Sequence, residues 1–219
     1  MRRAPVYLLI DTSGSMHGEP ITAVKNGLDL CISELRNDPE SMEKAYVSII
    51  TFAEKAEVAL PLTYVADIGV LPQLEAHGTT SLGAAINLLN DRMNTEIVKN
   101  SKETKGDYKA FVLILTDGKP TDEKVLLEAI KNINYKKISY LIVATTDKES
   151  KHLLTQITQK EENVLCLPTL NSERLKVFFK WVSQSVSESN SHGDDVKGGD
   201  VGELPPLPGD IIDDAGDLL

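Results

Sequence analysis

The sequence predicts a doubly wound α/β fold: a mostly parallel six-stranded sheet with one antiparallel edge strand and helices on both faces. Short runs rich in β-branched residues alternate with segments whose apolar residues recur every three or four positions, as in β-α repeats. Runs such as 110–116 are apolar almost throughout, which is typical of parallel strands buried on both faces. Two further runs are split only by residues 53–55, which predicts an antiparallel hairpin at the sheet edge.

The predicted elements follow one another in a regular order along the chain. The strands cover residues 5–10, 45–53, 56–61, 110–116, 138–145 and 163–167. Five segments between and after them have the apolar spacing of amphipathic helices, at residues 21–35, 82–93, 125–133, 153–157 and 175–186. The helix starts carry typical signals, because Pro20 fits a first helical turn and Ser81, Asp122 and Ser172 are predicted caps.

The composition is that of an ordinary globular protein, and the charge is unevenly distributed. Of the 219 residues, 41% are hydrophobic and 26% charged, so one main domain is expected. The net charge is −10, and residues 188–219 hold nine acidic residues and one Lys. We therefore divide the chain into a domain over 1–187 and an acidic tail with Gly and Pro over 188–219. Neither part has the basic stripe that nucleic-acid binding requires.

The tail has two distinct halves. Residues 187–200 have linker composition, whereas Leu204-Pro205-Pro206-Leu207-Pro208 favours an extended polyproline conformation. Apolar residues at 211–212 and 218–219 stand among aspartates. An unstructured solubilising tail fits this pattern. So does a short motif that docks on a partner or folds back, offering an Asp to the metal site of its own or a neighbouring molecule and thereby allowing self-association.

Cysteines and targeting signals are sparse. Cys31 and Cys166 both lie in apolar patterns, so we expect core positions; a disulfide between them stays open, and no Cys-x-x-Cys pair suggests zinc. Only one short apolar strand follows Met1-Arg2-Arg3, so neither a signal peptide nor a membrane span is indicated. We expect a cytoplasmic location.

The loop after the first predicted strand carries the main functional signal. Residues 11–15 read Asp-Thr-Ser-Gly-Ser, which places oxygen side chains of Asp11, Ser13 and Ser15 on one tight loop. Carboxylate and hydroxyl oxygens suit Mg²⁺, and also Ca²⁺ or Mn²⁺. In open α/β sheets, ligands bind beyond the carboxyl ends of the strands, which is where this loop lies.

Two later segments are expected at the same edge. Asp117 follows the buried run 110–116 directly, and the segment 77–83 brings Thr79 and Thr80 to a helix start. Each segment alone is common in turns and caps. Their joint occurrence in this order predicts a three-loop metal site of Asp11, Ser13, Ser15, Thr80 and Asp117.

These pieces together resemble the metal-ion-dependent adhesion site of von Willebrand factor A domains. That pattern is an Asp-x-Ser-x-Ser loop, a distant Thr and a later Asp, and it covers residues 4–187 here. By position, Asp11, Ser13 and Ser15 match the first element and Asp117 the last. Thr80 matches the Thr, since Gly83 and Ala85-Ile86 follow it as in the family; Thr79 stands where the family has Gly and offers an additional hydroxyl. The resemblance implies a Rossmann-like fold and a role in protein binding.

A narrower resemblance is to the tellurium-resistance TerY-like proteins. Residues 2–10 running into Asp-Thr-Ser-Gly-Ser-Met, then 18–21 and 23–27, carry it, as does Leu115-Thr116-Asp117-Gly118-Lys119-Pro120-Thr121-Asp122. The likeness implies a bacterial cytoplasmic interaction protein of stress-response gene clusters, with kinase-like and phosphatase-like partners.

The chemistry of the five residues predicts how such a site is used. Two carboxylates formally balance a divalent cation, and three neutral hydroxyls leave it electrophilic. If these side chains supply ligands directly or through water, an octahedral ion keeps one position for an outside oxygen. An Asp or Glu of a protein partner satisfies both its charge and its coordination.

The rival hypothesis is a Mg²⁺-dependent phosphohydrolase or phosphotransfer enzyme that uses Asp11. Phosphatases of the haloacid-dehalogenase type carry Asp-x-Asp after the first strand, whereas the second position here is Ser13, so the general acid is missing. His17 and His77 flank the loop, but no paired nucleophile and acid accompany them. We therefore expect surface or packing roles for both histidines and no catalysis.

Overall fold

The computed structural model describes residues 2–103, 105–191, 204–209 and 211. Its strands are β1 (Ala4–Asp11), β2 (Ala45–Phe52), β3 (Ala56–Tyr64), β4 (Ala110–Thr116), β5 (Ile138–Thr145) and β6 (Val164–Cys166). They form one sheet in the order β3-β2-β1-β4-β5-β6. All neighbours are parallel except β2 and β3, which pair antiparallel at the edge. The predicted fold class is confirmed, including its antiparallel edge strand.

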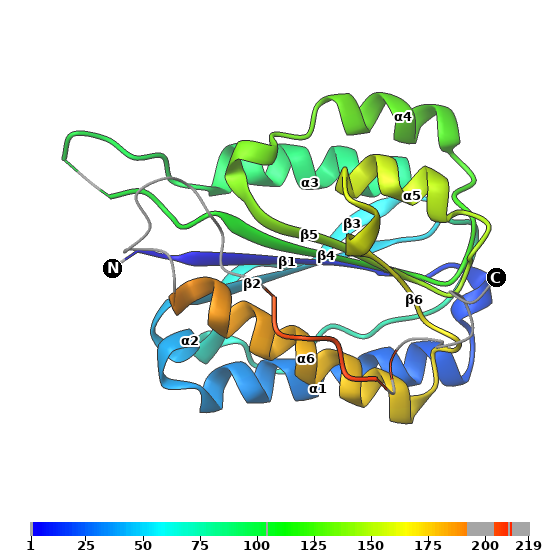
Figure 1. The fold of residues 1–219 in the computed structure, drawn as a ribbon, viewed down its shortest axis with the longest axis horizontal. Coiled ribbons are helices and arrows are strands. Elements are labelled where there is room, and N and C mark those ends of the chain that lie inside the picture. Colours follow the sequence, from blue (N-terminus) through cyan, green and yellow to red (C-terminus); the bar gives the residue numbers. More distant parts are fainter. Residues whose placement is uncertain (1, 104, 192–203, 210, 212–219) are drawn as a thin grey trace.

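Helices cover both faces of this sheet (Figure 1). On one face lie α3 (Leu82–Glu96), α4 (Glu123–Lys131) and α5 (Lys151–Thr158); on the other lie α1 (Glu19–Asn37), α2 (Pro39–Lys44) and α6 (Ser172–Ser191). Short 3₁₀ turns complete the chain: η1 (Gly14–Met16), η2 (Val65–Asp67), η3 (Tyr135–Lys137) and η4 (Glu161–Asn163). Helix α2 is too short to show an apolar period, and Asp38 caps it by accepting from the Ser41 N–H at 2.8 Å.

Two apolar clusters lie between the sheet and its helices. Strand β4 contributes to both, because successive side chains of a strand point to opposite faces. Phe111, Leu113 and Leu115 belong to the cluster under α1 and α6, whereas Val112 and Ile114 belong to the cluster under α3, α4 and α5. This burial on both faces explains why the central strands are nearly continuous apolar runs.

The helix starts differ from the predicted caps at three positions. Pro20 does lie in the first turn of α1. Ser81 precedes α3 but its hydroxyl donates to the Glu54 carbonyl, and Asp122 caps α3 instead of its own helix α4. Ser172 is the first residue of α6, and Asn171 accepts the capping bond from the Arg174 N–H. These residues are good cap formers, but the tertiary neighbours decide which helix they cap.

The two cysteines are free thiols, and only one is a core residue. Cys31 is fully buried in α1, and burial, followed by the charge of Glu34, raises its pKa to about 12. Cys166 is half-buried at the end of β6, because that short edge strand is open on one side. The prediction of a core position is therefore confirmed for Cys31 and wrong for Cys166.

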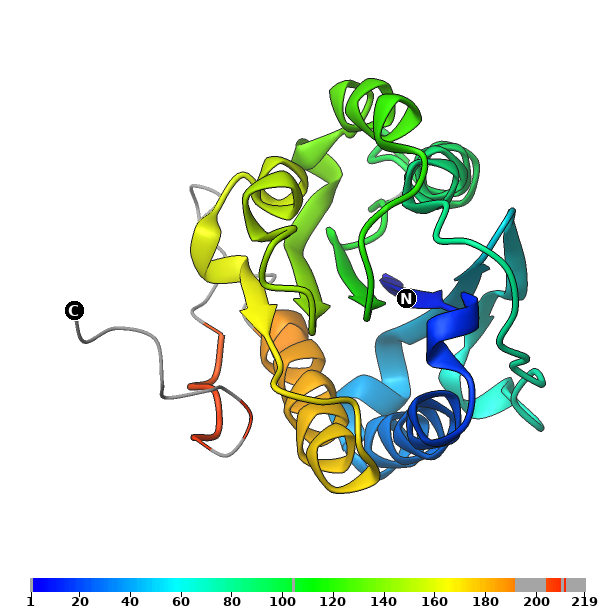
Figure 2. The same cartoon turned by 90° about the vertical axis from the view of Figure 1, so that its right-hand side faces the viewer.

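Part of the tail packs against the helix layer formed by α1, α2 and α6, which is called the lower helix layer below. Residues 204–209 and 211 lie beside α6 (Figure 2), and Ile211 is fully buried. The predicted linker at 187–200 lies outside the described residues from residue 192 onward, as do the apolar residues 212, 218 and 219. The boundary after residue 187 stays a prediction, and α6 itself runs to Ser191.

Within the described ranges, every helix is too short or too polar to cross a bilayer.

Candidate metal centre

Asp11 and Asp117 lie at the carboxyl ends of two neighbouring strands in the middle of the sheet. Asp11 is the last residue of β1, and Asp117 directly follows β4. The two strands pair in parallel, with Ile10 opposite Leu115. From β1 the chain proceeds outward to β2 on one side and later resumes at β4 on the other, so the strand order reverses here. Such a switch point is where open α/β sheets bind ligands.

Two protein donors hold the Asp11 carboxylate in a fixed orientation. Its Oδ1 accepts from the Ser13 N–H at 2.7 Å. Its Oδ2 accepts from the Thr116 hydroxyl, which comes from the last residue of β4. Asp11 and Thr116 are both fully buried. Thr116 is a positioning residue absent from the sequence prediction, because its contact with Asp11 depends on the pairing of β1 with β4.

A chain of hydroxyl contacts joins the first loop (residues 11–15, after β1) to the third (residues 117–122, after β4). The Ser13 and Ser15 hydroxyl oxygens lie 3.0 Å apart. Ser15 donates onward to Asp117 Oδ1 at 2.7 Å. Ser13 is buried and Ser15 is exposed, so the cluster runs from the sheet end to the surface. Four of the five predicted ligands are therefore in one hydrogen-bonded group.

Thr80 lies near the same group and belongs to the second loop, which is the segment before α3 (residues 77–81). A Cβ built on Gly118 would lie 3.8 Å from the Thr80 hydroxyl oxygen and 3.8 Å from that of Ser15. The side-chain position at 118 is thus the space between these two hydroxyls, and glycine keeps it open. Thr80 is buried, whereas Thr79 is exposed. The structure therefore brings all five predicted residues together and places Thr80, of the two threonines, nearer the cluster.

Backbone hydrogen bonds fasten the three loops to one another. The Gly14 N–H donates to the Gly78 carbonyl at 3.0 Å, and the His77 N–H donates to the Thr12 carbonyl at 2.8 Å. Gly78 has a φ of 69°, a conformation that favours glycine. The Thr121 N–H donates to the Thr80 carbonyl at 2.9 Å, which ties the second loop to the third. These backbone bonds hold the oxygen cluster of the three loops in place.

The two carboxylates lack a compensating positive charge. Burial raises the pKa of Asp11, hydrogen bonds from Ser13 and Thr116 oppose that rise, and the charge of Asp117 adds to it. Burial likewise raises the pKa of Asp117, and the Ser15 hydrogen bond opposes it. Among the described residues, no Lys, Arg or His forms a recorded ion pair with either carboxylate. A divalent cation would remove this unfavourable charge.

The donor set fits a hard cation. Two carboxylates and three hydroxyls are oxygen ligands of the kind that Mg²⁺, Ca²⁺ and Mn²⁺ prefer. In the described part of the chain, no three His, Cys, Asp or Glu side chains gather as a metal-binding group. Two carboxylates formally balance one divalent ion, and the three hydroxyls add neutral oxygen ligands.

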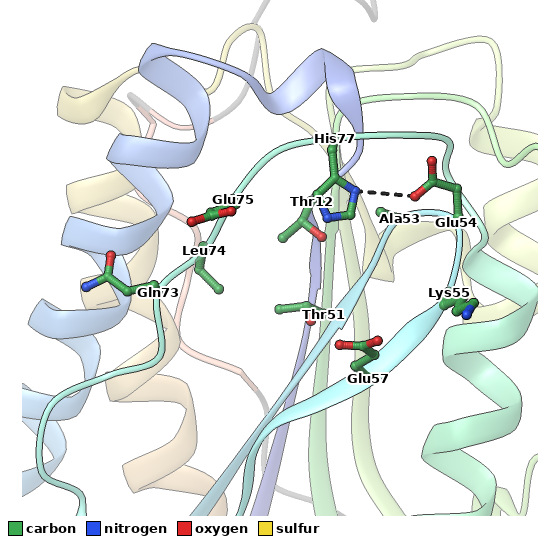
Figure 3. A pocket seen from close by; sticks show the side chains of 10 residues that line it. All are labelled: Thr12, Thr51, Ala53, Glu54, Lys55, Glu57, Gln73, Leu74, Glu75 and His77. Carbon is green, nitrogen blue, oxygen red and sulfur yellow. Dashed lines mark ion pairs between the residues drawn. The ribbon is translucent and has the colours of Figure 1, made fainter.

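A separate cavity of about 490 Å³ opens beside the first two loops, between the β2–β3 hairpin and residues 73–77 (Figure 3). Thr12 and His77 line it, but none of the five predicted ligands does. His77 is exposed and its Nδ1 lies 3.3 Å from a Glu54 carboxylate oxygen. His17 is also exposed. Both histidines have the surface positions that the sequence predicts.

Comparison with known proteins gives a consistent family and fold. The profile of the von Willebrand factor type A domain matches residues 6–179. A search of curated proteins found no match. Among solved structures, the chain is similar to a von Willebrand factor type A protein from Catenulispora acidiphila, with 17% identity, a TM-score of 0.64, and coverage of 85% of this chain and 43% of that one.

Two further structures show the range of proteins that share the fold. One is proximal thread matrix protein 1 from the mussel byssus, described with a zinc-occupied MIDAS motif: 17% identity, TM-score 0.60, covering 84% of this chain and 48% of that one. The other is the pilus adhesin SpaC from Lactobacillus rhamnosus GG: 12% identity, TM-score 0.69, covering 86% and 31%. The chain spans less than half the length of each of these structures. At such identities the likeness shows the fold.

Proposed function

Because this chain belongs to the von Willebrand factor type A family, we propose that it is a protein-binding module that works through a divalent cation. In this proposal Asp11, Ser13, Ser15, Thr80 and Asp117 hold the ion, directly or through water. Mg²⁺ is the expected ion, with Ca²⁺ and Mn²⁺ as alternatives. The partner supplies an Asp or Glu side chain.

One observation carries the proposal: the buried carboxylate of Asp11 and the half-buried carboxylate of Asp117 share one hydrogen-bonded cluster, and among the described residues no basic side chain forms an ion pair with either. Buried charges in proteins are normally paired or bound to metals, because an isolated charge is costly to desolvate. Ser13, Ser15 and Thr80 are hydroxyl donors that can turn their lone pairs toward a cation. The cluster thus has the oxygen ligands of a cation site, and a divalent cation would balance the charge of its two carboxylates.

Each part of the cluster has a distinct role in partner binding. Thr116 and the Ser13 N–H fix the Asp11 carboxylate, and Ser15 fixes that of Asp117, so the oxygens do not need to reorganise. Bound there, the cation supplies a Lewis-acidic position for an anionic oxygen. Because the protein's two carboxylates only balance the charge of the cation, a partner carboxylate can coordinate the ion without meeting a net negative site.

We extend the proposal to a cellular setting on the resemblance of residues 2–27 and 115–122 to the TerY-like proteins. In that setting the chain acts in the cytoplasm of a bacterium, within a tellurium-resistance or stress-response complex. The expected partners are kinase-like or phosphatase-like proteins. A carboxylate on the surface of such a partner is the group that the metal would bind.

The enzyme alternative finds no support in the geometry around Asp11. Both Asp11 oxygens are engaged by Ser13 and Thr116, which does not suit a nucleophile that must reach a phosphoryl group. The residue two positions on is Ser13, which is a poor general acid. We therefore propose a binding module without turnover.

Affinity purification tests the proposal directly. The full chain is used as bait in Mg²⁺ and in EDTA, alongside Asp11→Asn and a control, Asp147→Asn, whose carboxylate follows β5 at the same sheet edge but outside the cluster. We expect partner recovery in Mg²⁺ with the wild type and the control, and loss in EDTA or with Asp11→Asn. Hydrolysis of a phosphate ester that requires Asp11 would instead establish the enzyme, and equal recovery in all samples would refute metal-dependent binding.

A further inference from the structure

The lower helix layer is completed by an extended segment instead of a third long helix. One face of the sheet carries α3, α4 and α5, whereas on the other face α1 and α6 are followed by residues 204–209 and 211 (Figure 2). The segment runs along the outer side of α6, in the opposite direction to the helix (Figure 1). It thereby covers the part of the core that faces the β5–β6 side of the sheet.

Trp181 is the centre of the contact between α6 and this segment. Its indole N–H donates to the Pro205 carbonyl at 2.9 Å, and only 2% of the residue is exposed. The ring stacks on Phe178, with 5.9 Å between the ring centroids. Ile211 is fully buried in the same apolar cluster, and Leu204 and Leu207 pack against it. One anchored carbonyl and three apolar side chains thus hold the segment.

This contact has the chemistry of proline-rich peptide recognition. Leu204-Pro205-Pro206-Leu207-Pro208 holds three prolines, whose rings fix φ and keep the unbound peptide extended, so little conformational entropy is lost on binding. Proline has no N–H, so such peptides bind aromatic surfaces through their carbonyls and apolar side chains. The Trp181 indole offers the matching donor.

We propose that the α6 surface centred on Trp181 is a binding site for extended Leu-Pro-Pro-Leu-Pro segments, and that the chain's own residues 204–211 are its resident ligand. The site is independent of the metal centre, because it lies on a helix face and uses none of the five predicted metal ligands. A protein partner with a segment of the same chemistry binds there by displacing the resident one.

The way in which the segment is attached to α6 allows a peptide from another protein to replace it. Twelve residues, 192–203, join it to α6, and four of them are glycine. The backbone hydrogen bond of Ile211 goes to Pro208 within the segment, so it is independent of the helix. A connection of twelve residues corresponds to an effective concentration on the order of 1 mM, against which a free peptide must compete.

The experiment uses the full chain and a labelled peptide of residues 201–211 as the probe. In the variant Leu204→Asp/Leu207→Asp, the resident segment loses its apolar contacts and leaves Trp181 free. We expect the peptide to bind this variant at least about tenfold more tightly than the wild type, because the tethered competitor is gone. Trp181 is the only Trp of the chain, so its emission should shift to the red in the variant and back on peptide addition.

Three controls make the result specific. A scrambled peptide should not bind, and Val70→Asp, at an apolar residue that is 93% exposed, should behave as the wild type. Trp181→Phe in the double variant keeps an aromatic ring but removes the N–H, and should weaken peptide binding several-fold. Pro205→Gly/Pro206→Gly keeps both leucines and serves as a milder way to release the segment if the double variant does not fold.

Two results would overturn the proposal. The first is a folded variant that does not bind the peptide, or that binds it no better than the wild type does; residues 204–211 would then be a fixed part of the domain. The second is a wild-type dimer in light scattering that dissociates in the double variant, which would make the occupant a segment from a second copy.

Discussion

Asp11 is a buried carboxylate whose two oxygens each have a protein donor, yet no basic side chain in the described part of the chain forms an ion pair with it. Thr116 reaches it from the next strand and also lies 3.3 Å from the Gly118 carbonyl, so its hydroxyl has an alternative acceptor. This arrangement fixes the geometry of the carboxylate without neutralising it. The cation-free protein therefore carries an electrostatic cost that a bound cation relieves.

The first prediction concerns stability without a cation. Asp11→Asn keeps an oxygen for the Ser13 N–H, and its amide N–H can donate to Thr116 while the Thr116 hydroxyl turns to Gly118. Removing the buried charge should stabilise the protein in EDTA by about 1 kcal/mol, which raises the melting temperature by roughly 2–4 °C for a chain of this size. Thermal unfolding in EDTA measures this, with Asp147→Asn as the control. A lower melting temperature for Asp11→Asn would show that its charge is already compensated.

The second prediction concerns the space at Gly118. The Cβ of Gly118→Ala would lie 3.8 Å from the Ser15 and Thr80 oxygens, which is an ordinary contact, so the free energy of unfolding should change by less than about 0.5 kcal/mol. The same methyl stands between two predicted ligands, so Mg²⁺ affinity should fall by about tenfold, or ~1.4 kcal/mol. Denaturant unfolding and calorimetric titration measure the two effects. Gly69→Ala, with nothing within 4 Å, is the control, and unchanged Mg²⁺ affinity in Gly118→Ala would argue against Thr80 and Ser15 as joint ligands.

The third prediction concerns the thiols. Burial raises the pKa of Cys31 to about 12, so the folded state keeps its proton where an unfolded chain has lost it. Its contribution to stability is therefore complete below the ordinary thiol pKa of about 8.5 and declines as the pH rises from there toward 12. In the native protein at pH 8.5, iodoacetamide should modify Cys166 and leave Cys31 unmodified until denaturant is added. Equal labelling of both, read by mass spectrometry, would contradict this.

At the scale of elements, the loops at the carboxyl edge support one another through side chains that cap neighbouring helices. Asp122 belongs to the loop before α4, yet its carboxylate accepts from the Gly83 and Ala84 N–H groups at the start of α3, both at 3.0 Å. The Thr121 contacts with the Thr80 carbonyl lie directly beside this cap. The second and third metal-site loops therefore form one unit.

The fourth prediction tests this cross-helix cap. Asp122→Ala leaves two helix N–H groups without their acceptor and should lower the free energy of unfolding by about 1 kcal/mol. Amide hydrogen exchange at Gly83 and Ala84 should become faster, whereas Asp122→Asn, which retains one acceptor, should have a smaller effect. If exchange is faster only within α4, then Asp122 caps its own helix, as the sequence alone suggests.

The elements differ in how well the sequence predicts them. The central strands follow from their apolar runs, because burial on both faces leaves no room for polar residues. Ser81 and Asp122 do lie at the N-cap positions of α3 and α4, but their side chains bond elsewhere, and Asn171 takes the capping bond expected of Ser172. A hydroxyl or carboxylate binds the donor or acceptor that the tertiary fold brings nearest. Asp11 and Asp117 could be found because each follows a strand end, whereas Thr116 needs the β1–β4 register to be known.

At the scale of the whole molecule, one sheet supports both candidate binding surfaces, the metal centre and the α6 surface at Trp181. Its carboxyl edge gathers the oxygen cluster from three loops, and its lower face is finished by α1, α6 and the segment 204–211. The tail composition alone left both an unstructured tail and a docking motif open, because the contact between Trp181 and Pro205 depends on the tertiary structure. Metal-dependent binding and proline-rich recognition would then use separate surfaces. A partner bound at one of these sites would leave the other site accessible.

Calorimetric titration of MgCl₂ into the full chain is the direct test of a divalent cation held by Asp11 and Asp117. The wild type and Asp147→Asn should each bind one ion, and ions that bind only the folded state should also raise the melting temperature, by an amount set by their concentration relative to the Kd. Asp11→Asn should show neither heat nor stabilisation. Absence of binding by the wild type, or undiminished binding by Asp11→Asn, would contradict the assignment of these oxygens to a divalent cation.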